Sequence, residues 1–289
     1  MKSEKNILIA FLLNLFFSIF EIFGGLFTNS IAILSDSLHD FLDALSIGTS
    51  YILEKKSKKR ANKVYTYGYS RYSVLGAFIT TTMLLAGSSI MIYQAIIRLY
   101  NPIKLNYNGM FIIALIGLII NLIATYFTKD GNTLNEKSVN LHMLEDVFGW
   151  LVILVGSLVI KFTGILWFDS IMTILVSIYI FVHAIKNLKE VLDLFLLKRP
   201  SDIDTDKIKK YLLQIDGIKD VHHIHIWSLD GINNYATLHV ICNTNVKDII
   251  REELKKHDIN HVTIEIETED ELCSYRNCNN LSKVEHHHH

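Results

Sequence analysis

The segment GMFIIALIGLIINLIATYFT, residues 109–128, contains twenty consecutive residues without a charged side chain. A helix of about 20 apolar residues is long enough to cross the roughly 30 Å hydrocarbon core of a bilayer. Five further runs of similar length lie on either side of it, so we expect a membrane domain of six helices over residues 1–199. The predicted spans are residues 6–27, 31–53, 72–99, 109–128, 139–160 and 165–186.

The charges divide the chain into two parts. Residues 1–200 carry 18 basic and 13 acidic side chains, a net charge of +5, whereas residues 201–283 carry a net charge of −5. Together with the long apolar runs, this distribution excludes a single soluble domain, a disordered chain and a strongly basic nucleic-acid-binding protein. We therefore expect a membrane protein with a small acidic soluble domain and no nucleic-acid partner.

Lysine and arginine predict the orientation in the membrane. The connection between the second and third spans contains six of them within residues 55–63, while the other side has little more than Arg98, Lys104 and Lys161. Short basic loops stay in the cytoplasm, so we expect both termini there and the chain in the plasma or inner membrane. The three cysteines (Cys242, Cys273 and Cys278) all lie in the soluble part, in agreement with a reducing compartment.

Residues 200–283 predict a small α/β domain in the cytoplasm. Hydrophobic periodicity indicates helices over 201–215 and 247–257, the first of them capped by Ser201 or Asp202. Strands are indicated over 221–229, 235–242 and 261–268, with a hairpin turn at Asp230-Gly231. The element order is αββαβ. Residues 284–289 resemble the remains of a purification tag, and their histidines are left out of the argument about metals.

Two of the membrane spans carry the same pair of metal-binding side chains. His39 and Asp43 lie four residues apart in the second span, and His142 and Asp146 repeat that spacing in the fifth. Residues four apart share one helix face, so two facing helices would supply two nitrogens and two oxygens, a tetrahedral set suited to Zn²⁺. The structural alternative, capping or snorkelling residues, is disfavoured because charges at mid-membrane depth are costly.

Three more carboxylates accompany these pairs. Asp36, Asp40 and Glu145 fall within about 100° of the paired ligands on a helical wheel. They could attract cations, relay protons or extend the coordination, or they could hydrogen-bond to neighbouring helices and water.

Several motifs along the chain are familiar from one protein family: residues 14–25, 30–39, 65–71 and 141–146, Asp169, and residues 221–229. Through these motifs the sequence resembles the cation diffusion facilitator family, the zinc-transporter-like divalent cation/proton antiporters, over nearly its whole length. Glu145 departs from the family pattern, because many relatives have a small residue there. Residues 128–138 lack the histidine-rich insert of many eukaryotic members, which favours a prokaryotic type.

The resemblance implies a homodimer in the lipid bilayer, with a six-helix, Y-shaped membrane part and a ferredoxin-like cytoplasmic domain. It also implies that His39, Asp43, His142 and Asp146 form the transport site. A histidine must be neutral and a carboxylate ionised to bind a metal, so metal and protons compete for the site. We expect Zn²⁺ efflux in exchange for protons, with Zn²⁺ as substrate and regulatory ligand and no prosthetic group; Cd²⁺, Co²⁺, Ni²⁺, Mn²⁺ and Fe²⁺ stay open as main substrates.

A second metal site is expected on the cytoplasmic domain. Strict alternation along the strands places His223 or His225 with His239, Glu265 and Glu267 on the outer face of the sheet. The family resemblance instead favours His222 with His239, Glu265 and Glu267, and we adopt that set. Cys273 and Cys278 are spaced too far apart for a zinc knuckle, although thiolates could add soft ligands.

Other functional classes fit the sequence less well. An intramembrane metalloprotease needs a string such as H-E-x-x-H, which residues 1–283 lack, and no phosphate-binding loop indicates an ATP-driven pump. We therefore expect a transporter rather than an enzyme. A cation channel or a metal-sensing membrane protein without proton coupling is the alternative.

Overall fold

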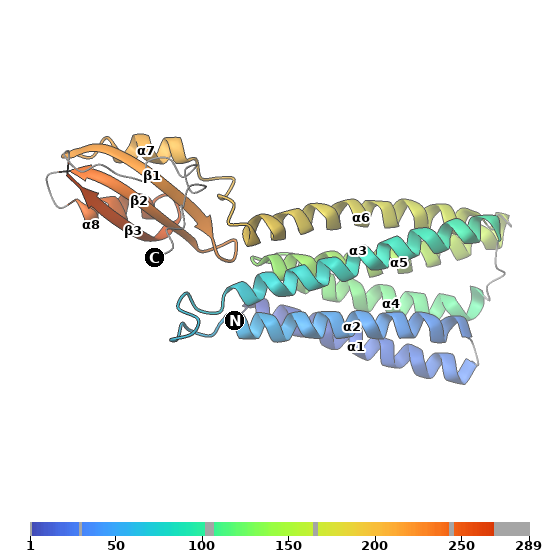
Figure 1. Ribbon diagram of the computed structural model, residues 1–289. Coiled ribbons are helices and arrows are strands. Elements are labelled where there is room, and N and C mark those ends of the chain that lie inside the picture. The colour runs from blue at the N-terminus through green and yellow to red at the C-terminus, as the bar shows by residue number, and fades with distance from the viewer. Residues whose placement is uncertain (1, 29–30, 102–106, 164–166, 243–245, 269–289) are drawn as a thin grey trace, which may run out of the picture. The chain divides into compact units, whose positions relative to one another are not determined.

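The computed structural model describes residues 2–28, 31–101, 107–163, 167–242 and 246–268. The chain divides into two compact units, Met1–Leu192 and Asp193–His289, and each is described by itself. Six long helices come first, and a small α/β unit follows (Figure 1). The long helices are α1 (Lys2–Thr28), α2 (Ile31–Ser57), α3 (Arg71–Tyr100), α4 (Tyr107–Thr128), α5 (Leu134–Thr163) and α6 (Trp167–Phe195).

Within the described residues, the helices cover the six predicted spans; residues 165 and 166 of the last span lie outside the described residues. Within the described residues, four stretches are long and apolar enough to cross a membrane: Ser3–Phe23, Arg71–Tyr100, Leu134–Gly156 and Ser170–Phe195. In α4 the described part of the apolar stretch is Ala114–Thr128, and α2 carries buried carboxylates and two lysines. The described part of the first unit is therefore a membrane-type helical bundle with polar groups on an inner helix.

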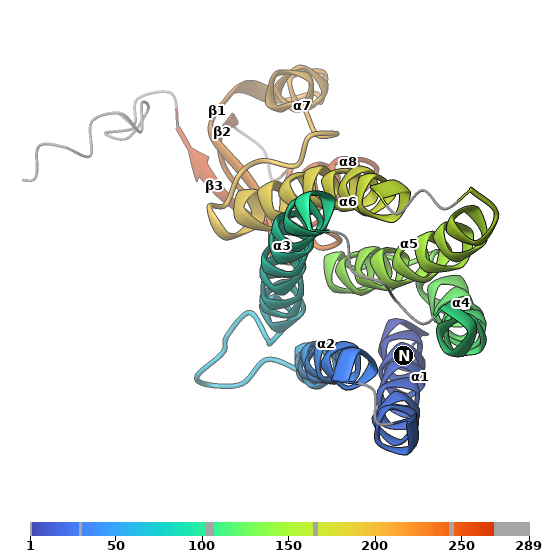
Figure 2. The ribbon, with the colours of Figure 1, turned by 90° about the vertical axis from the view of Figure 1, so that its right-hand side faces the viewer.

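The bundle is built from neighbouring antiparallel pairs (Figure 2). Helix α1 packs along α2 and α4 along α5, while α3 lies against both α2 and α5. Phe17 meets Trp150 edge to face, with 5.3 Å between the ring centroids. Gly117 permits this contact, because a Cβ there would lie 2.7 Å from each ring. The apolar core of the bundle thus depends on a close approach of α4 to α1 and α5.

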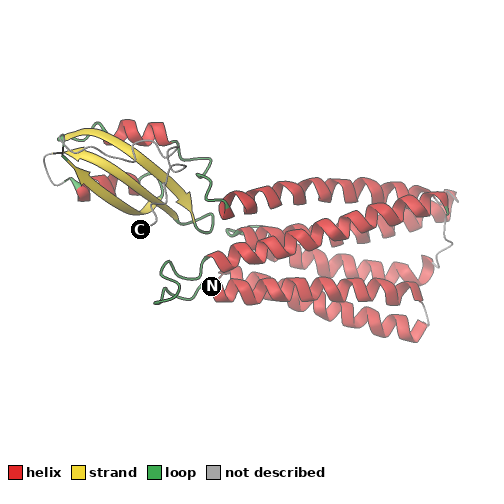
Figure 3. Cartoon of the chain, viewed as in Figure 1, coloured by secondary structure: helices red, strands yellow, loops and turns green. Residues whose placement is uncertain are grey.

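The second unit is an open-faced α/β domain with the predicted αββαβ order (Figure 3). Its sheet has the order β1-β2-β3, with β1 antiparallel to β2 and β2 parallel to β3. The two helices contribute apolar side chains to one shared core with the sheet, which leaves the other sheet face for polar residues. The elements are α7 (Thr205–Leu212), β1 (Ile218–Ser228), β2 (Asn234–Cys242), α8 (Lys247–Lys255) and β3 (Ile259–Glu267).

The structure corrects the expected start of the first cytoplasmic helix. Asp204, rather than Ser201 or Asp202, caps α7, and its carboxylate accepts hydrogen bonds from the backbone N–H groups of Asp206 (2.9 Å) and Lys207 (3.2 Å). These two N–H groups hold the pKa of Asp204 below its ordinary value. The helix starts where a carboxylate can satisfy its first N–H groups.

The predicted hairpin turn is present at Asp230-Gly231. Gly231 has φ +84°, a backbone conformation that other L-residues rarely adopt. The carboxylate of Asp230 accepts hydrogen bonds from the backbone N–H groups of Ile232 (3.0 Å) and Asn233 (2.8 Å). The turn therefore closes through local side-chain hydrogen bonds, as Asp in such a turn predicts.

A pair of glycine substitutions tests the packing of α5 in the bundle. A Cβ on Gly76 would lie 2.7–2.9 Å from the side-chain amide of Asn135, whereas a Cβ on Gly149 would have nothing within 4 Å. We expect Gly76→Ala to destabilise the solubilised protein by about 1–3 kcal/mol through overpacking, and Gly149→Ala to leave its thermal unfolding midpoint unchanged or higher. Equal midpoints for the two variants would contradict the close contact of α3 with Asn135.

Candidate metal centres

A group of acidic and imidazole side chains lies inside the helical unit. Asp43 on α2 faces His142 and Asp146 on α5, and one ligand atom of each lies within 4.8 Å of the others. The Nε2 atom of His142 is 3.6 Å from Oδ1 of Asp43. Asp43 is 9% exposed and His142 is 2% exposed, so bulk water screens this group little.

The imidazole of this group lacks the hydrogen-bond partners that buried polar atoms need. Within the described residues, neither ring nitrogen of His142 has a hydrogen-bond partner, although buried polar atoms are nearly always paired. Two carboxylates beside one imidazole also leave negative charge in a buried place. A cation or added protons would compensate this charge, and a divalent ion would use the imidazole nitrogen as well.

An asparagine from α1 completes the surroundings of Asp146. Asn14 is 3% exposed and donates a hydrogen bond from Nδ2 to Oδ2 of Asp146, at 3.2 Å. Asn14 is not among the site residues predicted from the sequence, although a lone amide in a long apolar run is a signal for a polar role inside the bundle. By donating to one oxygen of Asp146, Asn14 helps to orient this carboxylate beside His142 and Asp43.

The other predicted residues of this site fall into two classes. The side chains of His39 and Asp36 lie outside the described residues, so the fourth ligand is a prediction. Asp40 is half-buried and Glu145 is 8% exposed, and both lie close enough to Asp146 to act on it electrostatically. The structure thus brings Asp43, His142 and Asp146 together and places additional negative charge beside them.

The residue before α5 and the first two turns of that helix form what we call the polar collar: Thr133, Asn135, Glu136, Ser138 and Asn140. Its members are hydrogen-bonded to the segments around α5. Thr133 contacts Ser3, with 3.3 Å between the hydroxyl oxygens. Glu136 accepts from Asn6 at 2.6 Å. These contacts attach the start of α5 to the start of α1.

The remaining collar residues reach the other four long helices. Asn135 donates to the backbone oxygen of Ser50 on α2 (3.0 Å), and Ser138 accepts from Thr81 on α3 (3.1 Å) and Asn187 on α6 (2.7 Å). Asn140 donates to Thr128 on α4 (2.9 Å). The collar lies at the bundle end where α2 ends and α5 begins. At that end, the helices are closed around α5 by buried hydrogen bonds.

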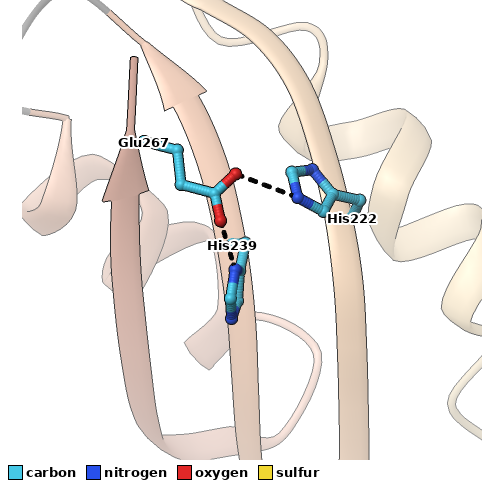
Figure 4. A group of neighbouring side chains, drawn as sticks. All are labelled: His222, His239 and Glu267. Carbon is cyan, nitrogen blue, oxygen red and sulfur yellow. Dashed lines mark hydrogen bonds and ion pairs between the residues drawn. The ribbon is translucent and has the colours of Figure 1, made fainter. Parts of the chain in front are cut away.

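A second group of ligand-type side chains lies on the polar face of the sheet (Figure 4). Glu267 on β3 bridges two histidines: Oε2 is 3.0 Å from Nε2 of His222, and Oε1 is 2.5 Å from Nδ1 of His239. Candidate ligand atoms of the three residues lie within 4.8 Å of one another. His222 is 9% exposed and Glu267 is 5% exposed, although both belong to the face away from the helices.

A β-bulge explains why simple alternation failed on β1. His222 pairs with His239, but the next paired residue on β1 is His225, opposite Thr237, so β1 has one residue more than β2 there. His223 takes φ +54° and is the extra residue. The prediction from strict alternation, which placed His222 on the core face, is therefore wrong. His222 and His239 share the polar face, and Val221 and Ile226 both point into the core.

The neighbours of this group differ in their roles. Glu265 comes within 3.4 Å of Nε2 of His239, but its side chain is 67% exposed and it is not part of the compact group. His223 stacks on His239, with 4.6 Å between ring centroids. Burial and the nearby imidazoles of His223 and His239 lower the pKa of His225, which favours its neutral form. Cys273 and Cys278 lie outside the described residues.

One functional neighbour was missed by the sequence analysis. Asp220 lies two residues before His222 on β1, and its Oδ2 is 3.4 Å from Nδ1 of that imidazole. Lys209 on α7 donates to the other oxygen of Asp220 at 3.0 Å. A carboxylate on the far nitrogen orients a ligating imidazole and raises its basicity. Asp220 thus directs Nε2 of His222 toward Glu267.

Comparisons with known proteins give one consistent family. Residues 7–196 match the profile described as the cation efflux transmembrane domain, and residues 200–269 match that of the cation efflux protein cytoplasmic domain. The chain is 33% identical over 274 residues to the metal cation efflux system protein CzcD of Cupriavidus metallidurans, covering 92% of this chain and 87% of the relative.

Two further relatives have similar coverage. A cadmium, cobalt and zinc/H(+)-K(+) antiporter of Bacillus subtilis is 32% identical over 279 residues, 92% of this chain and 90% of the relative. The zinc transporter ZitB of Pectobacterium atrosepticum is 29% identical over 286 residues, 94% of this chain and 89% of the relative. Both units of the chain are therefore matched by the same kind of protein.

Substitutions at the bulge test the geometry of the cytoplasmic group. Glycine adopts φ +54° without strain, whereas a β-branched residue does not. In an Asp146→Ala background, which removes one carboxylate of the membrane group, we expect His223→Val to weaken Zn²⁺ binding about tenfold through 1–3 kcal/mol of backbone strain. His223→Gly should bind like the parent. Isothermal titration of the full chain with Zn²⁺ measures the affinity of each variant. The control is His261→Val, a substitution at an exposed position of the same sheet. Equal affinities for the His223→Val and His223→Gly variants would contradict the role of the bulge.

Proposed function

The chain belongs to the cation diffusion facilitator family, and on this premise we propose that it exports a divalent transition-metal ion, foremost Zn²⁺, from the cytoplasm in exchange for protons. Members of this family are transporters and not enzymes. The matched transmembrane domain and the four long apolar helices make the chain a multi-pass membrane protein. The relatives described above are named for cation efflux and for zinc, cadmium and cobalt, which supports this class of substrate.

The buried group of Asp43, His142 and Asp146 is the observation that carries the proposal. We assign the fourth ligand to His39, because it precedes Asp43 by four residues on the same helix and so shares its face. Two imidazoles and two carboxylates make a tetrahedral set that suits Zn²⁺, and the same donors also accept Cd²⁺, Co²⁺, Ni²⁺, Mn²⁺ or Fe²⁺ in other geometries.

Proton coupling follows from the chemistry of these donors. Each ligand that binds a metal ion must first be free of its proton. Buried carboxylates also need a counter-charge. Without a metal ion, carboxylates in this site therefore tend to bind protons, because several uncompensated negative charges are costly to bury. A site that meets each side of the membrane in turn would therefore exchange metal for protons. Glu145 and Asp40 add negative charge beside the ligands, and we assign them to the electrostatics of this exchange.

If the site opens to each side of the membrane in turn, the polar collar must open and close the path at its end of the bundle. In this structure the collar closes the bundle at the end where α2 ends and α5 begins, which we assign to the cytoplasmic side together with both termini. A metal ion can reach the site from there only if α5 separates from its neighbours, and the hydrogen bonds of Asn135, Ser138 and Asn140 must then be exchanged for water. Such exchange is nearly balanced in free energy, so the bonds can close the path without locking it.

The second unit completes the proposal. We assign residues 1–199 to the membrane domain and residues 200–283 to a cytoplasmic domain that associates with its copy in a homodimer; the match over residues 200–269 supports dimerisation. The group of His222, His239 and Glu267, with Glu265 beside it, is proposed to bind Zn²⁺ as a regulatory ligand. A channel or a sensor without proton coupling remains the competing function for the same site.

Transport measurements on a ligand variant test the main proposal. With a pH gradient imposed across proteoliposomes, we expect Zn²⁺ uptake by the native chain to follow the gradient. Loss of one ligand in Asp146→Ala should reduce the initial rate about 100-fold or more, because even residues that only support ligands contribute 10–100-fold. The exposed Asp130→Ala serves as the matched control.

Each other outcome of this experiment has a defined meaning. Equal uptake by the native chain and Asp146→Ala would move the transport site elsewhere. Uptake that ignores the pH gradient would favour a channel. A folded native chain that transports none of the divalent ions would leave a sensor as the better function.

Substitutions in the polar collar test its closing role. We expect the double variant Asn135→Ala/Asn140→Ala to open the cytoplasmic end more often, because it removes the side-chain bonds from α5 to α2 and α4. Hydrogen exchange at the start of α5 should become roughly tenfold faster for a loss of about 1.4 kcal/mol from these bonds. Lys137→Ala, an exposed residue of the same turns, is the control. Unchanged exchange in the double variant would contradict the collar as a closure.

A further inference from the structure

We propose that residues 55–71, which we call the basic segment, form a docking surface for the headgroups of anionic phospholipids. The segment joins the end of α2 to the start of α3 and contains seven lysine and arginine residues but no aspartate or glutamate. The lipid contact itself rests on charge, exposure and position.

The charge of the basic segment is largely uncompensated by the protein. Lys58 pairs with Glu4 at 3.8 Å and with Glu54 at 3.7 Å. Lys59, Arg60 and Lys63 are exposed, and no carboxylate of the described residues forms a salt bridge with them. Free ammonium and guanidinium groups beside the end of a membrane helix attract anionic headgroups, at about 1 kcal/mol per residue near the surface.

The segment is an ordered surface rather than a random tether. The side chain of Asn62 accepts hydrogen bonds from the backbone N–H groups of Val64 (2.9 Å) and Tyr65 (2.7 Å) and donates to the hydroxyl of Tyr69 (2.8 Å). Gly68 has φ +82° and donates from its N–H to the backbone oxygen of Tyr65 at 2.9 Å. These contacts hold the loop in one turn beside the helix ends.

Aromatic side chains anchor the same turn. The ring of Tyr65 lies 4.3 Å from that of Tyr69, and Lys56 places its ammonium group 4.0 Å from the ring centre of Tyr72. Two other side chains of the segment expose apolar surface to the outside: Val64 is 81% exposed and Tyr67 is 58% exposed. Positive groups next to exposed tyrosine at the ends of two membrane helices match the interface of a bilayer, where tyrosine is enriched.

These features favour a lipid over the other anions that could bind lysine. A free phosphate needs convergent donors around one point, whereas Lys59, Arg60 and Lys63 are spread along an exposed loop. An acidic protein would not require Val64 and Tyr67 to be exposed at the membrane boundary. An anionic phospholipid uses both features at once, the headgroup meeting the cations and the acyl chains meeting the tyrosine and valine.

The test compares lipid binding to the full chain in detergent by mass spectrometry of the intact complexes. Phosphatidylglycerol and phosphatidylcholine are titrated separately onto the native chain, the variant Lys59→Gln/Arg60→Gln/Lys63→Gln, and the control Lys207→Gln/Lys210→Gln/Lys255→Gln. The control removes the same number of charges from exposed positions of α7 and α8.

We expect the native chain and the control to prefer phosphatidylglycerol, and the loop variant to lose about tenfold or more of that preference. In the native chain the preference should fall as salt is raised, because salt screens exposed charges. Equal affinity of the native chain for the two lipids would overturn the proposal, and this arm does not depend on any variant folding. Loss of the preference in both triple variants would overturn it too, since the net charge would then matter rather than the loop.

Two further arms separate other ligands from the lipid. In the first arm, millimolar glycerol 1-phosphate competes with phosphatidylglycerol for the native chain. If it displaces bound phosphatidylglycerol as effectively as added phosphatidylglycerol does, the surface binds free phosphate and the proposal is overturned. Binding of polyglutamate to the basic segment without any lipid preference would assign it to an acidic protein and overturn it as well. None of these results bears on metal transport, so the proposal can fail while the transport function stands.

Discussion

The helical unit depends on satisfying the buried polar side chains at the start of α5. An unsatisfied polar group costs about 1–3 kcal/mol when buried, and water is scarce inside a membrane bundle. Three side chains of the polar collar are buried and two are half-buried, and together they are bonded to all five other long helices. This network places α5 at the centre of the unit and so places His142 and Asp146 opposite Asp43.

The two candidate metal centres have similar donor atoms but lie on different kinds of secondary structure. In the helical unit, helix periodicity aligns His142 with Asp146, and the packing of α2 against α5 adds Asp43. On the sheet, pairing between strands aligns His239 with the β3 glutamates, and a bulge turns His222 to the same face. Each centre also has a supporting polar side chain, Asn14 for Asp146 and Asp220 for His222.

The sequence predicted the features that depend on local periodicity. Long apolar runs gave the six helices, and the i, i+4 spacing put His142 and Asp146 on one helix face before the fold was known. Features that depend on partners far along the chain were not predictable. The contact of Asn14 with Asp146 joins residues 132 positions apart, and nothing local to α1 identifies its partner.

Local departures from regular backbone geometry were also not predicted from the sequence. Alternation assigned the wrong face to His222 because one residue of positive φ at His223 shifts the register, and the residue type there gave no warning. The start of α7 at Asp204 was missed because Ser201, Asp202 and Asp204 are all acceptable caps, and only the burial of Ile208 and Leu212 selects among them. Glu265 shares the polar sheet face with Glu267 but is not part of the compact group, so alternation along a strand alone does not identify the members of the group.

The pairing of α1 with α2 and of α4 with α5 has a consequence for biosynthesis. A ribosome releases α1 before α2 and α4 before α5, so the more apolar helix of each pair enters the bilayer first. When the less apolar helix follows, a packed neighbour is already present to shelter its polar face from lipid. The order of the helices along the chain thus lowers the cost of inserting a helix with several charged side chains, and a circular permutation that began the chain at α2 or α5 would remove that protection.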